Sequence, residues 1–271
     1  MVCKKLRTCN CLLTELKHIA VIGGSGMLGS DLVRYFQTSF RVTSIDKTNY
    51  DDYKRHSFDI IINANGNSRR YWANKNPQQD FLASTVSVYN SFFDFHADAY
   101  IYISSPDVYP NPSSTVSTKE DEMIDSTSLG VYGFHKYLSE NIVKKFNKNF
   151  LILRPAMILG TRLKKGPVYD ILHGHPLYIT LSSTFQFITT EAIARIIVAL
   201  LEMDIRSTTI NVGGKGAFSF TKISDYIHYD IQVSAYAEKQ IYHMNVDKLQ
   251  HIYPSLKSSK QYLEDFLRRM L

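Results

Sequence analysis

One stretch near the start of the chain constrains its fold more than any other. An apolar run, Ile19 to Ile22, leads directly into three evenly spaced glycines, Gly23, Gly26 and Gly29, and a helical pattern of apolar residues follows. A strand, a glycine turn and a helix in this order present free backbone N–H groups to a phosphate. The first glycine permits the tight turn, the second lets a pyrophosphate approach the backbone, and the third lets helix and strand pack closely.

A second apolar run, Arg41 to Ile45, ends in an acid, Asp46. A carboxylate on the order of 20 residues after such glycines is placed to bind the hydroxyls of an adenine ribose. It also disfavours a ribose that carries a 2′-phosphate, although the adjacent Lys47 weakens that argument. The two segments together predict a dinucleotide site that prefers NAD, with NADP as the alternative.

Apolar runs and helical patterns alternate along the chain, which is typical of a doubly wound parallel sheet. We therefore predict an α/β, Rossmann-like fold with a smaller C-terminal substrate-binding region. Residues 1–17 are expected to form an N-terminal extension, 18–160 the dinucleotide-binding domain and 161–271 mainly the substrate-binding region, with about 185–214 returning to the first domain. The predicted strands are 18–22, 41–45, 59–63, 99–104, 150–154 and 208–212; the predicted helices are 27–38, 78–96, 132–147, 190–203 and 259–271; the predicted loops are 109–129 and 161–183.

Composition excludes several classes of protein. The chain is 44% hydrophobic and 21% charged, as in ordinary globular proteins. Its net charge is +6, but no run of Lys or Arg exceeds two residues, so we expect no nucleic-acid partner. No apolar run approaches the length of a membrane span. Cys3, Cys9 and Cys11 are too few for a zinc site and unlike a disulfide framework, so we expect no metal and a cytoplasmic location.

Two further segments carry residues suited to acid–base chemistry. A predicted strand ends in two serines, Ser104 and Ser105, and a predicted helix begins with Tyr132 and Lys136, which share one face because they are four apart. A lysine ammonium beside a phenol lowers the pKa of the phenol from about 10 towards neutrality. Such a phenol can take a proton from a hydroxyl or return one to a carbonyl oxygen, while a serine hydroxyl holds that oxygen.

In the order of these segments the chain resembles the extended short-chain dehydrogenase/reductase family, which contains the nucleotide-sugar epimerases, dehydratases and reductases. The resemblance runs from about His18 to Leu267 and includes the segments 62–66, 104–109, 153–160 and 185–188. It implies a catalytic set of Ser105, Tyr132 and Lys136, and a homodimer formed through the helices at 78–96 and 132–147. The cofactor-binding set that it implies is Gly23, Ser25, Gly26, Met27, Leu28, Gly29, Asp46, Asn63, Ala64, Asn65, Gly66, Ser104, Tyr132, Lys136, Arg154 and Pro155.

The chain departs from the family pattern in three places. Ser84 stands where the family usually has an asparagine, His135 stands where it favours a small residue, and the stretch between the second and third strands is short, as in 4-keto-sugar reductases. The family's dehydratases carry Asp-Glu after the strand hydroxyl, whereas this chain has Pro106 and Asp107, so dehydration is disfavoured. We therefore predict an NAD(P)-dependent oxidoreductase or epimerase acting on a nucleotide-activated sugar. The alternatives are a 4-keto-sugar reductase that uses NADPH and a non-catalytic dinucleotide sensor.

Basic residues near the expected carboxyl ends of strands suit a substrate diphosphate. Taken one at a time, each of them also fits an ordinary solvated surface cation. The predicted substrate residues are Asp107, Arg69, Arg162 and Lys164, and Arg70, Arg154 and Lys165 lie beside them in the sequence.

Overall fold

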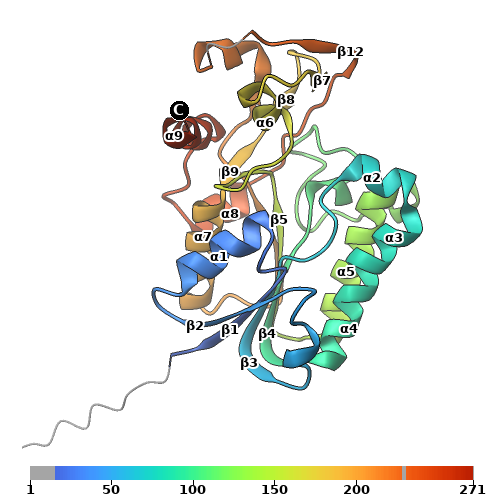
Figure 1. Cartoon of the computed structure of the whole chain (residues 1–271), viewed down its shortest axis with the longest axis vertical. Helices are drawn as coiled ribbons and strands as arrows, with labels where there is room; N and C mark the ends of the chain where they lie inside the picture. The colour runs from blue at the N-terminus through green and yellow to red at the C-terminus, as the bar shows by residue number, and fades with distance from the viewer. Residues whose placement is uncertain (1–15, 228–229, 271) are drawn as a thin grey trace, which may run out of the picture.

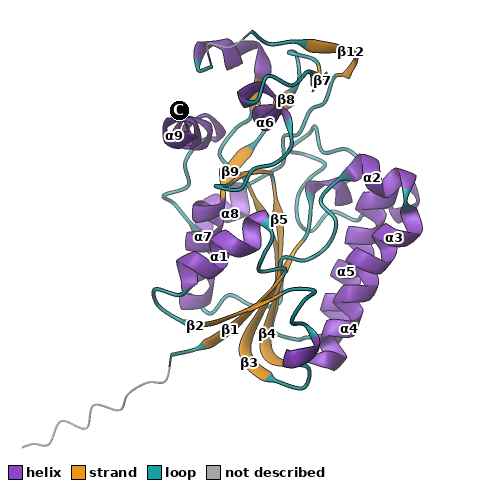
Figure 2. Cartoon of the chain, in the orientation of Figure 1, coloured by secondary structure: helices purple, strands orange, loops and turns teal. Residues whose placement is uncertain are grey.

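The protein, analysed as a computed structural model that describes residues 16–227 and 230–270, is built around one parallel sheet. Six strands run side by side in the order β10-β5-β4-β3-β1-β2, and every neighbouring pair is parallel (Figures 1 and 2). They are β1 (His18–Ile22), β2 (Arg41–Ile45), β3 (Ser57–Asn63), β4 (His96–Ile103), β5 (Phe150–Pro155) and β10 (Thr208–Val212). The predicted α/β class with a doubly wound parallel sheet is confirmed.

Helices cover both faces of this sheet. On one face α1 (Met27–Phe36) packs against α7 (Thr190–Glu202), and on the other α4 (Ser87–Asp94) packs against α5 (Val131–Phe146) (Figure 1). The helix predicted over 78–96 consists of three parts, α3 (Pro77–Phe81), a π-helical turn (Leu82–Val86) and α4. Its predicted end is wrong, because His96 already belongs to β4.

The chain returns from β2 to β3 without a helix. This connection holds only a 3₁₀ turn, Asp51–Tyr53, as the dozen intervening residues predict. Strand β3 lies directly beside β1, on the side away from β2, so the strand order reverses at β1. In open parallel sheets ligands bind outside the carboxyl ends of the strands at this kind of reversal. Ile22 pairs with both Ile45 and Asn63, so the segments after β1, β2 and β3 emerge together at that edge.

Most of the rest of the C-terminal half lies beyond the carboxyl edge of the sheet, in the upper part of Figure 1, whereas the helix Asp247–Ile252 lies beside β10, where Lys248 contacts Thr208 and Thr209. The predicted loop 161–183 is wrong in part, because it contains a helix too short to give a periodic sequence pattern, while its strand agrees with the apolar residues after Pro176. The short strands pair as β6 with β9, β7 with β12 and β8 with β11. These elements are β6 (Met157–Leu159), α6 (Pro167–Leu172), β7 (Leu177–Ile179), β8 (Thr184–Phe185), β9 (Phe187–Thr189), β11 (Phe218–Ser219), β12 (Val233–Glu238), α8 (Asp247–Ile252) and α9 (Ser259–Met270).

The core lies on both faces of the sheet. Along β3, Ile60 and Ile62 pack into one buried cluster, and Ile61 packs into another on the opposite face. Burial on both faces explains why the strands read as continuous apolar runs rather than alternating ones.

In the described part of the chain, no helix has the length and apolar character needed to cross a bilayer.

The glycine turn between β1 and α1 generates a test of this packing. Gly23 has a positive φ of 81°, and a Cβ atom on Gly29 would collide with the Gly23 carbonyl oxygen. We expect Gly29→Ala to push α1 away from β1 and lower the free energy of unfolding by about 1–3 kcal/mol, measured by urea denaturation. Gly130→Ala is the control, since a Cβ there meets no atom within 4 Å. Equal midpoints for Gly29→Ala and the wild type would contradict this account.

Candidate active site

The glycine turn is folded tightly at the carboxyl end of β1. The N–H groups of Gly23 and Gly24 both donate to the Ile45 carbonyl oxygen, at 2.8 and 3.1 Å. Gly26 is the N-cap of α1, where no side chain caps the helix and no acidic residue stands in the first turn. The first-turn amides of a helix have no partner within the helix. Those of Met27, Leu28 and Gly29 are therefore suited to an anionic phosphate.

Asp46 lies next to this turn. Its carboxylate accepts hydrogen bonds from the Thr48 hydroxyl at 2.7 Å and the Thr48 amide at 2.9 Å, and these bonds lower the pKa of Asp46. The Ser25 hydroxyl, in the glycine turn, lies near enough to Asp46 to add a smaller lowering of this pKa. An ionised acid beside an uncapped helix N-terminus fits the ribose and pyrophosphate of a dinucleotide.

The segment after β3 forms the next wall of the site. The side-chain amide of Asn63 donates to the Tyr100 hydroxyl at 2.7 Å, and its side-chain oxygen accepts from the backbone N–H of Asn65 at 3.0 Å. Asn63 is fully buried, so its side chain shapes the turn rather than facing a ligand. Gly66 has a φ of 115°, and a Cβ there would lie 3.7 Å from the Lys136 Nζ. The turn 64–66 therefore approaches Lys136 closely.

Tyr132 and Lys136 lie on α5, where both are buried, and Ser105 follows the end of β4. The Ser105 hydroxyl donates to Asp107 at 3.1 Å, and it lies near enough to the Tyr132 hydroxyl to lower the pKa of Tyr132. The Lys136 ammonium donates to the Ile103 carbonyl oxygen at 3.1 Å. The predicted phenol and serine hydroxyl are thus neighbours, next to a carboxylate.

The predicted lowering of the Tyr132 pKa is wrong for the chain alone. Burial raises the pKa of Tyr132 well above its usual value, and the negative charge of Asp107 raises it further, while the Ser105 hydrogen bond lowers it. Burial also lowers the pKa of Lys136 to about 8. Desolvation of both groups thus outweighs the lowering of the phenol pKa that a lysine four residues away was predicted to cause.

Arg154 has a different role from the one predicted. Its guanidinium is 1% exposed and donates to the two Glu140 carboxylate oxygens at 2.9 and 2.7 Å, and to the Tyr109 hydroxyl at 2.6 Å. The prediction that Arg154 contacts a cofactor or a diphosphate is therefore wrong, because the group is enclosed by its own partners. Ser104 is also buried and donates to Glu140 at 2.6 Å.

The predicted substrate residues do not form one group. Arg162 and Lys164 are exposed. Lys165 reaches across to the segment after β3, where its ammonium donates to the Ser68 hydroxyl at 2.7 Å. Burial and the positive charge of Arg69 lower the pKa of Lys165 to about 8.

Asp107 is joined by Arg70, which sequence reasoning grouped with the cations suited to a substrate diphosphate, and by Tyr242, which it did not assign to the site. It accepts a hydrogen bond from the Tyr242 hydroxyl at 2.7 Å and lies 3.4 Å from an Arg70 nitrogen. Tyr242 stands in no motif, so no sequence signal connects it with Asp107, which lies 135 residues away.

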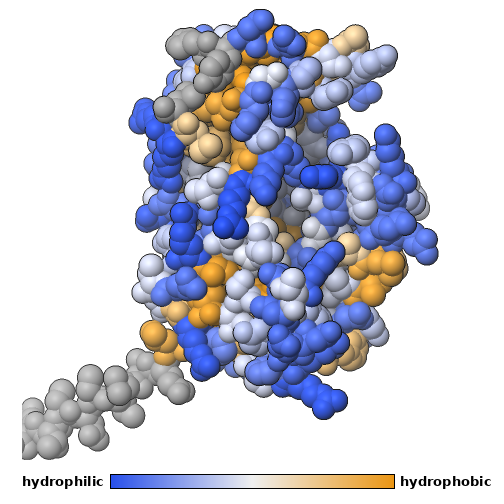
Figure 3. Space-filling model, viewed as in Figure 1, coloured by the Kyte–Doolittle hydropathy of each residue, from blue (hydrophilic) through white to orange (hydrophobic). Residues whose placement is uncertain are grey.

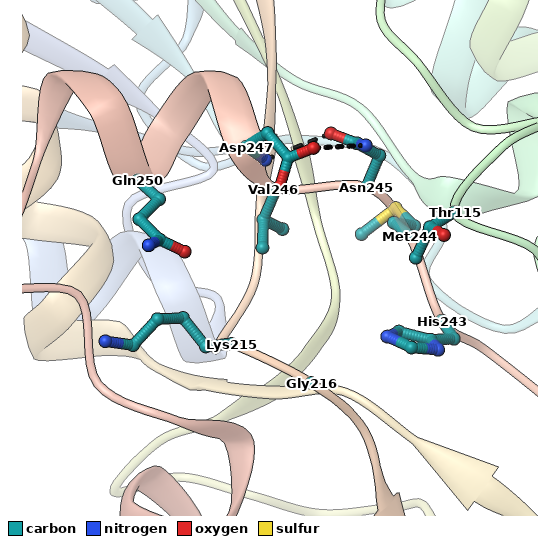
Figure 4. Close-up of a pocket in the computed structure, with 9 residues that line it drawn as sticks. All are labelled: Thr115, Lys215, Gly216, His243, Met244, Asn245, Val246, Asp247 and Gln250. Atoms are coloured by element: carbon teal, nitrogen blue, oxygen red, sulfur yellow. Dashed lines mark hydrogen bonds between the residues drawn. The ribbon is translucent and has the colours of Figure 1, made fainter.

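A separate hollow of about 170 Å³ lies near the start of α8 (Figure 4). Figure 4 shows His243 on one side of it and Lys215 and Gln250 on the other, with Asp247 hydrogen-bonded to Asn245. None of the predicted site residues lines it.

A sequence profile described as the NAD dependent epimerase/dehydratase family matches residues 19–213. The chain belongs to this family. The match includes the glycine turn, Asp46, Ser105, Tyr132 and Lys136, so the site lies within the family's shared part. A search of curated protein sequences found no significant match.

Solved structures of similar fold include both epimerases and reductases. A Bacillus cereus UDP-glucuronic acid 4-epimerase variant, in complex with UDP-4-deoxy-4-fluoro-glucuronic acid and NAD, is 19% identical with a TM-score of 0.73, covering 94% of this chain and all of that one. A Bacillus anthracis dTDP-4-dehydrorhamnose reductase with NADP is 16% identical with a TM-score of 0.76, covering 94% and 98%. A Methanobrevibacter ruminantium UDP-N-acetylglucosamine 4-epimerase is 18% identical with a TM-score of 0.74, covering 94% and 98%. At these identities the likeness concerns the fold.

The buried Lys136 makes stability depend on pH. Its folded pKa of about 8 lies below its ordinary 10.5, so between these values the unfolded chain holds more protons than the folded one. Stability therefore rises with pH in this window, where the cost of burying the ammonium is relieved. Over this window we expect the free energy of unfolding of the wild type to rise relative to that of Lys136→Met, by up to about 1.4 kcal/mol for each unit between the two pKa values. Urea unfolding from pH 7 to 10 measures this change. The exposed Lys75→Met is the control. A constant difference across this range would refute the prediction.

Proposed function

We propose that this protein is an NAD(P)-dependent oxidoreductase or epimerase that acts on a nucleotide-activated sugar. The observation that carries the proposal is the proximity of the buried Tyr132 to Ser105 at the carboxyl edge of the sheet, within the matched family region. Bound NAD supplies a hydride acceptor and donor for the reacting carbon. Tyr132 takes the proton of the substrate hydroxyl as the alcohol becomes a ketone, and returns it in the reverse direction.

The surrounding residues have supporting roles in this proposal. Ser105 holds the substrate oxygen beside the phenol, and Lys136, one turn further along α5, supplies positive charge. The amides of the first turn of α1 bind the pyrophosphate, and Asp46 binds the ribose hydroxyls and favours NAD over NADP. Bound NAD, whose oxidised ring is positive, would add to the charge that stabilises the phenolate.

Epimerisation and reduction share the same first step, and the chain suits both. The short β2–β3 connection favours the reductase alternative, and Asp46 favours an NAD-dependent epimerase. Dehydration requires a further acid and base next to the serine, and Pro106 supplies neither. A non-catalytic dinucleotide sensor is less well supported, because a protein that catalyses no reaction does not need the Tyr132 phenol beside the Ser105 hydroxyl.

The substrate side of the proposal uses the region beyond the sheet edge. We propose that residues 161–271 mainly bind the nucleotide sugar, and that Arg69, Arg162 and Lys164 attract its diphosphate while Asp107 faces the sugar. We also propose a cytoplasmic location. Cys3, Cys9 and Cys11, on which that expectation depends, lie outside the described residues.

The test of the reaction is a mass-spectrometric screen of the purified protein with activated sugars in heavy water, with NAD(H) or NADP(H). A stereoisomer formed without net redox and without solvent deuterium on carbon identifies an epimerase that transfers hydride, and net reduction identifies a reductase. Tyr132→Phe removes the proton-transferring oxygen, so we expect turnover to fall by at least about 10²-fold, while cofactor binding, measured by calorimetry, is retained. Wild-type turnover in this variant would exclude the proposed chemistry.

We further propose a homodimer formed through an aromatic patch on the face of α3, α4 and α5. Its members are Phe81, Leu82, Tyr89, Phe93 and Phe146, which are 38, 53, 43, 58 and 44% exposed. Figure 3 shows hydrophobic side chains on this side of the molecule. The rings of Tyr89, Phe93 and Phe146 lie within 5.5 Å of one another, centre to centre, so they form a continuous apolar surface of the kind that marks interfaces.

A charge in this patch should break the dimer. We expect Phe93→Glu to be monomeric by light scattering at a concentration at which the wild type is dimeric, because an interface core does not tolerate an unpaired charge. Met123→Glu is the control, as a single exposed residue (93%) outside the patch. A monomeric wild type, or a dimeric Phe93→Glu, would count against this interface.

A further inference from the structure

A cluster of three side chains surrounds the carboxylate beside the predicted catalytic pair. One Asp107 oxygen accepts from the Ser105 hydroxyl at 3.1 Å, and the other accepts from the Tyr242 hydroxyl at 2.7 Å. The Arg70 guanidinium donates to the Tyr242 hydroxyl at 2.5 Å and lies 3.4 Å from Asp107. The Asp107 side chain is only 19% exposed. The hydroxyl and guanidinium groups around it replace hydrogen bonds to water that an enclosed carboxylate loses.

The partners of Asp107 come from well-separated segments, and Tyr242 is firmly held. The Tyr242 amide donates to the Thr184 carbonyl oxygen at 2.8 Å, and its own carbonyl oxygen accepts from the Gln186 amide at 3.1 Å. Its ring stacks on Phe185, with centroids 5.6 Å apart and planes 13° apart. The hydroxyl is thus a fixed donor presented by the C-terminal region to the end of β4. Arg70 is the first residue of α2 (Arg70–Lys75), which follows β3.

We propose that Arg70 and Tyr242 are positioning residues for the reaction, which clamp the Asp107 carboxylate against Ser105 and compensate its negative charge next to Tyr132. The inference rests on the proposed role of Tyr132 as the proton-transferring group. It adds two residues from outside the family's catalytic motif. It also gives the C-terminal region a direct effect on the chemistry, beyond holding a substrate.

The charges around Tyr132 define what the clamp does. Asp107 and, more weakly, Asp80 on α3 raise the pKa of Tyr132, while Tyr102 on β4 and Tyr242 lie within range of its charge. Lys136, one turn further along α5, is the nearby cation of the helix. An uncompensated carboxylate at 107 would hold the proton on the phenol and oppose the step that takes a proton from an alcohol. Arg70 offsets the charge of Asp107 at the carboxylate oxygen that does not accept from Ser105.

The test uses NAD⁺ itself as the probe, so it does not depend on knowing the sugar. The oxidised nicotinamide ring carries a positive charge, and its affinity should rise as Tyr132 loses its proton. The dissociation constant of NAD⁺ is measured by calorimetry from pH 6 to 10.5 in the wild type and in Tyr132→Phe. The rise in affinity that Tyr132→Phe removes is the contribution of Tyr132. It begins near the pKa of Tyr132 in the NAD⁺ complex, and that pKa, the titration midpoint of the bound phenol, is then compared between variants.

We expect Asp107→Asn to move this midpoint to lower pH, and Arg70→Met and Tyr242→Phe to move it to higher pH, each by on the order of half to one unit. Arg70 is 47% exposed, so its replacement leaves the fold intact. The controls are Lys75→Met on the same helix and Tyr236→Phe, which is 86% exposed; both should keep the wild-type midpoint. In the Asp107→Asn background the shift from Arg70→Met should shrink, because Arg70 is held at the site through Asp107.

Two results would overturn the clamp. One is a wild type that shows no rise in NAD⁺ affinity attributable to Tyr132. The other is an unchanged midpoint in both Arg70→Met and Tyr242→Phe. Neither result would touch the proposed reaction, which the turnover screen with activated sugars tests separately.

Discussion

A buried ion pair between Glu140 and Arg154 holds the carboxyl edge of the sheet together. Glu140 lies on α5 and Arg154 on β5, and neither side chain is more than 1% exposed. Glu140 also accepts the hydroxyl of Ser104 after β4, and Arg154 also donates to Tyr109. Removing one partner of such a pair typically costs about 3–5 kcal/mol, because a buried charge is left uncompensated. The helix that carries the proposed phenol is therefore fixed relative to the strand that carries its serine.

The second constraint is the strand order. Because β2 and β3 lie on either side of β1 and run parallel to it, the carboxyl ends of the three strands meet at one edge. Gly23, Asp46 and Gly66 converge there, and Gly66 brings the backbone close to Lys136. A dinucleotide along this edge would extend from the glycine turn towards the phenol. The sheet thus accounts for the position of every proposed cofactor contact except the buried Arg154, Ser104 and Asn63, whose side chains are enclosed by the protein itself.

Much of the fold was predictable because its signals are local. Burial on both faces makes each sheet strand a continuous apolar run, and the glycine spacing marks the first turn. The short helix α6 was missed because six residues give no usable period. Arg154 was misread because a cation after a strand has the same sequence pattern whether it faces a phosphate or a buried glutamate. The contact of Tyr242 with Asp107 joins residues far apart in sequence and leaves no local signal.

The charge state of the phenol was the harder prediction. Sequence spacing brings a lysine near Tyr132, but it does not reveal that both groups are desolvated or that Asp107 is adjacent. The central claim is that a hydride moves between bound nicotinamide and a sugar carbon beside Tyr132. The most direct test places deuterium at the reacting sugar carbon for epimerisation, or at both C4 positions of the reduced nicotinamide for net reduction, and follows it by mass spectrometry of the sugar after turnover. The account predicts that an epimerised sugar keeps its deuterium and that a reduced sugar gains deuterium on a single carbon; a product in which solvent hydrogen occupies that carbon would contradict the account.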